Sequence, residues 1–234
     1  MKKEFNTTGS CNPEWHYMVD TSAKLAKIED LIERGKYFTI NRARQFGKTT
    51  TLKALYRRLL DRYHVIPISF EVGGAVNDKV EDFCRNFEFK MSKAGGMTSE
   101  QSDFWLNKDK STSLEELSLK ITTYCKLQSK PVLLLIDEVD KSTNNQLFLD
   151  FLGMLRNNYL DRDINGLNST FHSVILAGVY DVKNLKLKIR PESEQKYNSP
   201  WNIAIDFDID MTFHPEEIVT MLDEYEADHQ TGMD

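Results

Sequence analysis

The sequence predicts an α/β fold in which helices cover both faces of a mostly parallel sheet. Short β-prone runs alternate with amphipathic segments along the 234 residues, and this alternation is typical of parallel sheets. Residues 132–136 are apolar at every position, as expected of a strand buried on both faces. A stretch containing glycine and lysine, residues 41–50, lies between a β-prone run and a helical pattern. Since 40% of the residues are hydrophobic, the chain can bury one sizeable core.

The first half of the chain is predicted to begin with a helix at residues 20–34, where apolar residues recur at helical spacing. In the strand expected at 64–72, Pro67 indicates an edge position or a bulge, because proline lacks an N–H group. Ser113 and Glu116 have the spacing of a capping box. The other elements expected here are strand 36–41, helix 47–62, helix 78–94, a polar stretch 95–112 with a short helix near 104–106, and helix 113–127.

In the second half, residues 203–213 alternate apolar side chains with Asp206, Asp208 and Asp210. This alternation predicts a half-exposed strand whose aspartates face solvent, although three carboxylates on one face could also bind a metal. The other expected elements are the buried strand 132–136, helix 144–159, a polar flexible loop 161–170, strand 172–179, a helical or turn-like segment 180–190, a polar loop 192–200, and a last helix 215–225 with a proline in its first turn.

Residues 41–50 read Asn-Arg-Ala-Arg-Gln-Phe-Gly-Lys-Thr-Thr, close to the phosphate-binding pattern G-x-x-x-x-G-K-[ST]. Arg42 stands where the pattern has its first glycine, whereas Gly47, Lys48 and Thr49 fit it. Gly47 lets the main chain approach a phosphate without a Cβ in the way. Lys48 would reach the β/γ-phosphates, and the Thr49 hydroxyl would bind Mg²⁺. A chance G-K-T is the alternative, and the strand–loop–helix context favours the nucleotide site. The residues expected to contact the nucleotide are Arg44, Gln45, Phe46, Gly47, Lys48, Thr49 and Thr50.

The apolar run 132–136 ends in Asp137 and Glu138. Ligands of open α/β sheets bind at the carboxyl ends of the strands, so these carboxylates are predicted to lie beside the loop. Asp137 is the expected metal ligand together with Thr49. Glu138 is the expected catalytic base that orients the attacking water, and Lys48 is the second catalytic candidate. The alternative is a buried strand that ends in a solvated acidic turn.

These two motifs resemble those of the AAA-ATPase-like family of bacterial P-loop proteins, which is related to archaeal-type ATPases and STAND NTPases. Residues 42–49 match the family's form R-x-R-x-F-G-K-[ST], so the missing glycine looks like a family variant of the Walker A loop. Residues 16–20 and 213–218 resemble the segment before the loop and the start of a helical lid. The resemblance covers about residues 15–225. It implies a three-layer α/β/α P-loop NTPase fold of the additional-strand type, with one strand inserted between the strands that bear Walker A and Walker B.

From this resemblance we expect a P-loop ATPase core at 1–213 and the start of an incomplete, truncated helical lid at 214–234. The expected function is that of a cytoplasmic, Mg²⁺-dependent ATP-binding protein that hydrolyses ATP slowly to drive a conformational or assembly switch. The resemblance alone implies ATP over GTP, and the sequence contains no guanine-specific N-K-x-D. Two alternatives stay open, a non-hydrolysing nucleotide-binding or interaction module, and a defence- or DNA-linked ATPase.

Composition limits the partners that we expect. The net charge of −6 argues against a nonspecific nucleic-acid binder, although a local basic patch is compatible with it. Three widely separated cysteines, Cys11, Cys84 and Cys125, indicate reduced thiols in a cytosol. The sequence has no apolar run near the ~20 residues that span a bilayer, and no signal-peptide core. The expected partners are therefore ATP or ADP and a second copy or another protein, with nucleic acid left open and no membrane.

Several single residues have both a functional and a structural interpretation. Arg42 and Arg44 could contact phosphates or a neighbouring subunit, or form salt bridges at the sheet edge. Arg156 could be an arginine finger, but a solvated surface charge is the more ordinary interpretation. Tyr180 and Asp181 lie where related ATPases have a sensor residue, or form a structural turn. Residues 88–90 imitate a nuclease E-x-K signature by coincidence on a predicted helix.

Overall fold

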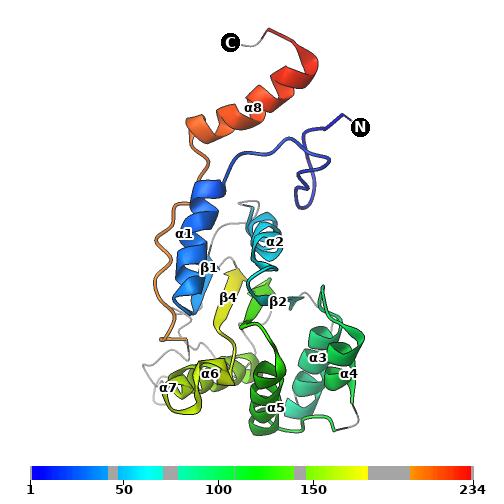
Figure 1. The fold of residues 1–234 in the computed structure, drawn as a ribbon, viewed down its shortest axis with the longest axis vertical. Helices are drawn as coiled ribbons and strands as arrows, with labels where there is room; N and C mark the ends of the chain where they lie inside the picture. The colour runs from blue at the N-terminus through cyan, green and yellow to red at the C-terminus, as the bar shows by residue number, and fades with distance from the viewer. Residues whose placement is uncertain are drawn as a thin grey trace.

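The computed structural model describes residues 2–41, 47–70, 79–107, 109–139, 146–178 and 201–232. At its centre is a four-stranded parallel sheet with the order β1-β4-β3-β2 (Figure 1). The strands are β1 (Phe38–Asn41), β2 (His64–Ser69), β3 (Val132–Asp137) and β4 (Ser173–Gly178).

The strand order confirms the additional-strand type. β4 lies between β1, which precedes the glycine-lysine loop, and β3, which ends at the acidic pair. β2 is the outer strand beyond β3, as Pro67 predicted. The N–H groups of His64 and Phe70 point to β3, to the carbonyls of Pro131 and Asp137. Because backbone N–H direction alternates along a strand, position 67 faces the outer side, where proline removes no ladder bond.

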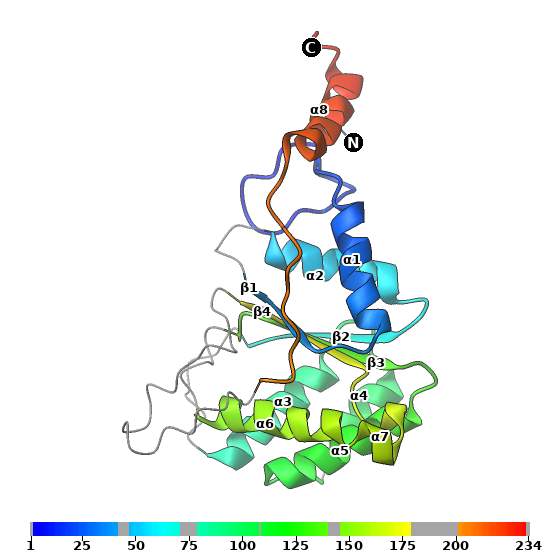
Figure 2. The same cartoon turned by 90° about the vertical axis from the view of Figure 1, so that its left-hand side faces the viewer.

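Helices cover both faces of the sheet in three layers (Figure 2). α1 (Ser22–Glu33) and α2 (Lys48–Leu59) pack on one face. The other face is covered by α3 (Val80–Ser92), α4 (Ser99–Leu106), α5 (Leu114–Leu127) and α6 (Gln146–Leu160). Side chains of β3 alternate between the two layers, with Leu133 and Leu135 toward α1 and α2, and Leu134 and Ile136 toward the other helices. Burial on both faces explains why this strand is apolar throughout.

Residues 161–170 are not the flexible loop that their polarity predicts. They form α7 (Arg162–Asn165) and the 3-10 turn η2 (Leu167–Ser169) around the buried Arg162. The Arg162 guanidinium donates to the carbonyls of His172 (2.8 Å) and Gly35 (3.1 Å), and lies 3.9 Å from the ring centroid of Tyr159. This arginine is buried because carbonyls and a ring face replace its hydration.

Residues 203–213 are extended, but the predicted strand is wrong. Among the described residues, one bridge joins this segment to the sheet, from Ile205 to Phe38 of β1, through the Ile205 N–H and the Tyr37 carbonyl at 2.9 Å. The predicted alternation of faces is nevertheless present, since Ile205, Phe207 and Ile209 pack against the core and the three aspartates are exposed. An alternating pattern reports which side is buried, and it does not report whether the backbone finds a ladder partner.

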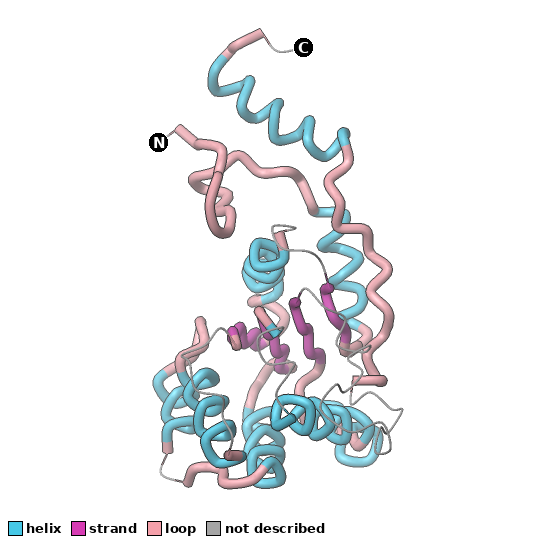
Figure 3. Tube along the Cα trace, turned by 180° about the vertical axis from the view of Figure 1, so that it is seen from behind, coloured by secondary structure: helices cyan, strands magenta, loops and turns pink. Residues whose placement is uncertain are grey.

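α8 (Pro215–His229) stands beyond the rest of the molecule and has no buried residue (Figures 1 and 3). It packs against residues 2–20, here called the N-terminal arm, which precede α1. Phe5 and Tyr17 of the arm meet Tyr225 of α8 with ring centroids 5.0–5.3 Å apart. Among the described residues, no helix is both long enough and apolar enough to cross a membrane.

Candidate functional site

The two sequence motifs meet at the carboxyl edge of the sheet. The Thr49 hydroxyl, in the first turn of α2, donates a hydrogen bond to Asp137 Oδ2 at the end of β3, at 2.6 Å. The two residues are 88 positions apart in the sequence, so only the fold brings them together. Because the hydroxyl is the donor in this hydrogen bond, the lone pairs of Thr49 Oγ1 stay available to a cation. Hydroxyl and carboxylate oxygens are the ligands that Mg²⁺ prefers.

Gly47 begins α2 in a conformation that suits glycine. Its φ is +68°, in the left-handed region, and a Cβ there would meet no atom of the described residues within 4 Å. The backbone conformation alone is enough to favour glycine at this position. The Gly47 carbonyl accepts the Thr51 N–H at 2.8 Å, which closes the first helical turn. The backbone N–H groups of this first turn and the positive end of the helix dipole lie together at the start of α2, an arrangement that favours an anion.

Asp137 is held by two hydrogen bonds from different directions. Oδ2 accepts from Thr49, and Oδ1 accepts the backbone N–H of Glu138 at 2.9 Å. Glu138 itself has a φ of +56°, which is unusual for a residue with a Cβ. The backbone therefore departs from the extended conformation of β3 at Glu138. The sequence predicts the two acids but gives no sign of this strained backbone.

The Thr50 side chain forms its hydrogen bond with the N-terminal arm, whereas the Thr49 side chain binds Asp137. Its Oγ1 accepts the backbone N–H of Cys11, from the N-terminal arm, at 3.2 Å. One turn further along α2, Lys53 Nζ donates to Ser10 Oγ at 2.5 Å. The arm thus lies directly against the helix that carries Lys48 and Thr49, a contact that local sequence patterns do not reveal.

Other sequence candidates lie elsewhere or outside the described residues. Arg42, Arg44, Gln45, Phe46, Tyr180 and Asp181 belong to the segments outside the described residues. Arg156 donates to Asn202 Oδ1 at 2.7 Å, a contact within the chain. Asp210 pairs with His214 at 3.1 Å, and the described part of the chain holds no group of three or more side chains suited to a metal.

Residues 88–90 are structural in α3, as the sequence indicated. Glu88 is fully buried, and its Oε1 accepts from Ser111 N (3.0 Å), Ser111 Oγ (2.7 Å) and Lys120 Nζ (3.1 Å). Lys90 Nζ donates to the Ser69 carbonyl at 2.8 Å, at the end of β2, and burial lowers the pKa of Lys90. Both side chains tie α3 and its neighbours together.

The parallel sheet with β4 inserted, the helices on both faces and the motif positions define a P-loop NTPase fold of the additional-strand type. Residues 9–233 match the family described as the AAA-like domain, and the chain belongs to this family. No curated protein is similar enough to count as a match.

Two solved structures have a similar fold. A Walker-type ATPase of Pyrococcus abyssi superposes with a TM-score of 0.60 at 16% identity, covering 98% of this chain and 63% of that chain. The Orc1 protein of Aeropyrum pernix, solved in complex with DNA, gives a TM-score of 0.50 at 10% identity, covering 90% of this chain and 50% of that chain. The chain therefore spans less than two thirds of the length of either structure. At these identities the likeness concerns the fold alone.

Proposed function

We propose that this protein binds ATP with Mg²⁺ at the carboxyl edge of its sheet and hydrolyses it slowly, to drive a conformational or assembly switch. The observation that carries the proposal is the 2.6 Å hydrogen bond between Thr49 and Asp137, which joins the two motifs. In the proposed site Lys48 neutralises the β/γ-phosphates, and Thr49 and Asp137 hold the metal, directly or through water. Arg44, Gln45, Phe46, Gly47 and Thr50 complete the proposed phosphate loop. Membership of the AAA-like domain family supports nucleotide binding.

Glu138 is the proposed base that orients and deprotonates the attacking water. Phosphoryl transfer needs mainly positioning and charge stabilisation, so Lys48, the metal and one carboxylate suffice for slow turnover. The competing proposal is a nucleotide switch that does not hydrolyse ATP. Comparing ATP turnover of the wild type with that of Glu138→Gln separates the two, because equal rates would favour the non-hydrolysing switch.

Binding of a fluorescent ATP analogue, with Mg²⁺ and with EDTA, tests the site directly. Lys48→Ala should weaken binding about 10- to 100-fold, since a charge-assisted hydrogen bond contributes roughly 1.5–3 kcal/mol. Lys27→Ala is the matched control, because Lys27 is an exposed lysine of the neighbouring α1. The proposal would be refuted if Lys48→Ala and the wild type bound the analogue with equal affinity, or if EDTA left the affinity unchanged.

We also propose the division into a core at 1–213 and a lid that begins at 214, since α8 buries no residue. A cytoplasmic location is supported by three cysteines that form no disulfide. A link to DNA is the weaker proposal, although the Orc1 structure of similar fold was solved in complex with DNA. Residues 201–234 contain ten acidic residues and no lysine or arginine, so this region would repel a phosphate backbone.

A further inference from the structure

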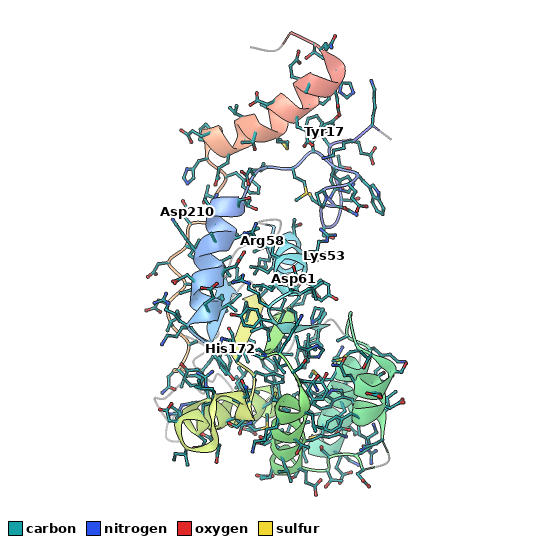
Figure 4. The ribbon with its side chains drawn as sticks, viewed as in Figure 1. Tyr17, Lys53, Arg58, Asp61, His172 and Asp210 are labelled. Carbon is teal, nitrogen blue, oxygen red and sulfur yellow. The ribbon has the colours of Figure 1, made fainter. Side chains whose placement is uncertain are left out.

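The N-terminal arm contacts α2 immediately beside the proposed metal ligand. Cys11 donates its backbone N–H to Thr50 Oγ1 at 3.2 Å, and Lys53 donates to Ser10 Oγ at 2.5 Å. In Figure 4 the Lys53 side chain extends from α2 toward the arm. Thr50 follows Thr49 in the same helical turn, so the group that holds the arm and the proposed magnesium ligand share one rigid piece of backbone.

Residues near both ends of the arm contact α8, whereas its middle, at Ser10 and Cys11, contacts α2. Tyr17 donates its hydroxyl to Asp228 Oδ2 at 2.9 Å, the Asp20 N–H donates to Thr220 Oγ1 at 3.0 Å, and Lys3 forms an ion pair with Glu224. Burial, together with the Asp228 carboxylate, raises the pKa of Tyr17 to about 12, so its hydroxyl remains a donor well into the alkaline range. Figure 4 shows Tyr17 between the arm and α8.

In the described part of the chain, α1 also holds the start of α8 and the segment before it. Lys24 of α1 bridges to Glu217 at 2.5 Å and donates to the Thr212 carbonyl at 2.7 Å. α8 buries no residue, so no packed core fixes its angle. Its position is therefore set by hydrogen bonds, ion pairs and rings, which small movements of the arm can rearrange.

We infer that the N-terminal arm is a strap that couples occupancy of the phosphate site at the start of α2 to the position of α8. The inference rests on the proposed nucleotide binding. Thr50, Lys53 and Tyr17 act in it as positioning residues. Thr50 and Lys53 hold the middle of the arm on α2, and Tyr17 holds α8 on the arm. Coupling between two sites is reciprocal. If bound nucleotide stabilises the contacts of the strap, then loss of those contacts lowers the affinity for nucleotide by the same factor.

Trp15 is a reporter built into the arm. It is 58% exposed, whereas Trp105 and Trp201, the other two tryptophans, are fully buried. Its backbone carbonyl accepts the Glu4 N–H at 2.9 Å, so it moves with the arm. Iodide, a charged collisional quencher, therefore reports mainly on Trp15 in the folded chain.

The experiment measures iodide quenching of the full chain with and without ATP and Mg²⁺, beside binding of the fluorescent nucleotide. In the wild type, ATP should shift the Stern–Volmer constant. Lys53→Met and Tyr17→Phe should lose that shift while retaining the fold by circular dichroism. Lys53→Met should also weaken nucleotide affinity about 5-fold or more, the lower end of typical coupling. Lys27→Met, on α1, is the control and should behave as wild type.

The outcomes separate the two proposals. Normal ATP binding with an unchanged quenching constant in wild type overturns the strap and leaves the proposed function intact. The strap is also overturned if Lys53→Met and Tyr17→Phe both show the full wild-type shift and affinity. No Mg²⁺-dependent ATP binding by wild type overturns the proposed function and the strap with it.

Discussion

Glu138 combines a proposed catalytic carboxylate with a strained backbone. Its φ of +56° lies in the left-handed region, which costs a residue with a Cβ roughly 1–2 kcal/mol. The Glu138 N–H donates to Asp137 Oδ1. The turn that strains the backbone of Glu138 therefore also orients the carboxylate of Asp137. Strain of this kind persists where the surrounding structure fixes it, and it concentrates at functional sites.

Substitution at position 138 should separate backbone strain from catalysis. Glu138→Gly should be more stable than Glu138→Ala by about 1 kcal/mol, because only glycine relaxes the positive φ. Both variants should lose ATP turnover if the carboxylate is the base. Urea unfolding of the two variants measures the difference. Alanine at least as stable as glycine would mean that the strain is not relieved at this position.

The candidate site was only partly predictable at the level of residues. Thr49 and Asp137 follow from the motif and the sheet-edge rule, and the structure brings them together. The pairing of Thr50 with Cys11 joins segments 39 residues apart, and nothing in either local sequence signals it. The buried Arg162 was missed for the same reason, because its carbonyl and ring partners come from distant segments.

At the scale of elements, one buried charge joins α3 to α5. Glu88 of α3 accepts a hydrogen bond from Lys120 of α5 and two from Ser111, just before α5, and Lys110 lies 3.7 Å away. A carboxylate without exposure is tolerated because these donors replace its water. The elements around it share no backbone ladder, so this cluster fixes their relative placement.

Glu88→Ala should therefore be strongly destabilising. Removal of the carboxylate leaves the Lys120 ammonium with only the neutral acceptors of Asn107 and Asp109, and we expect a loss of about 3 kcal/mol. Asp82→Asn, on the same helix, removes half of an exposed pair with Arg85 and should cost under about 0.5 kcal/mol. Chemical denaturation of both variants tests this, and similar losses for the two would contradict the structural role of Glu88.

Periodicity predicted most elements within a few residues. Helical spacing indicated α1, α2 and α6, and the apolar run indicated β3. Ser113 caps α5 as expected, since it accepts the Glu116 N–H, but the Glu116 carboxylate turns to Thr112 instead of closing the box. The segment 203–213 shows the limit of such patterns, because neighbouring strands decide whether an extended chain becomes a strand.

At the scale of the whole molecule, α6 and α8 differ in how many of their residues are buried. Both contain 15 residues, yet α6 buries six of them and α8 none. Regional stability follows buried apolar contacts, so α8 should open far more often than the layers around the sheet.

Hydrogen–deuterium exchange rates should therefore differ between α8 and the layers around the sheet. Amides of α8 should exchange through local opening, whereas those of α6 and β3 should require global unfolding. Addition of ATP and Mg²⁺ should slow exchange in α8 if the strap operates. Equal protection of α6 and α8 without nucleotide would show that α8 is fixed more firmly than its contacts suggest.

The aspartates of residues 203–213 have a consequence for how copies of this chain meet. In the described part of the chain this segment forms one bridge to β1, between Ile205 and Phe38, and so lies at a margin of the sheet. An exposed sheet margin can recruit strands from other molecules. Asp206, Asp208 and Asp210 project from this segment at every second position. An incoming identical segment would bring the same charges into register, and mutual repulsion would oppose stacking. Like-charge repulsion between these aspartates would therefore disfavour fibre-like pairing of two copies at this margin of the sheet.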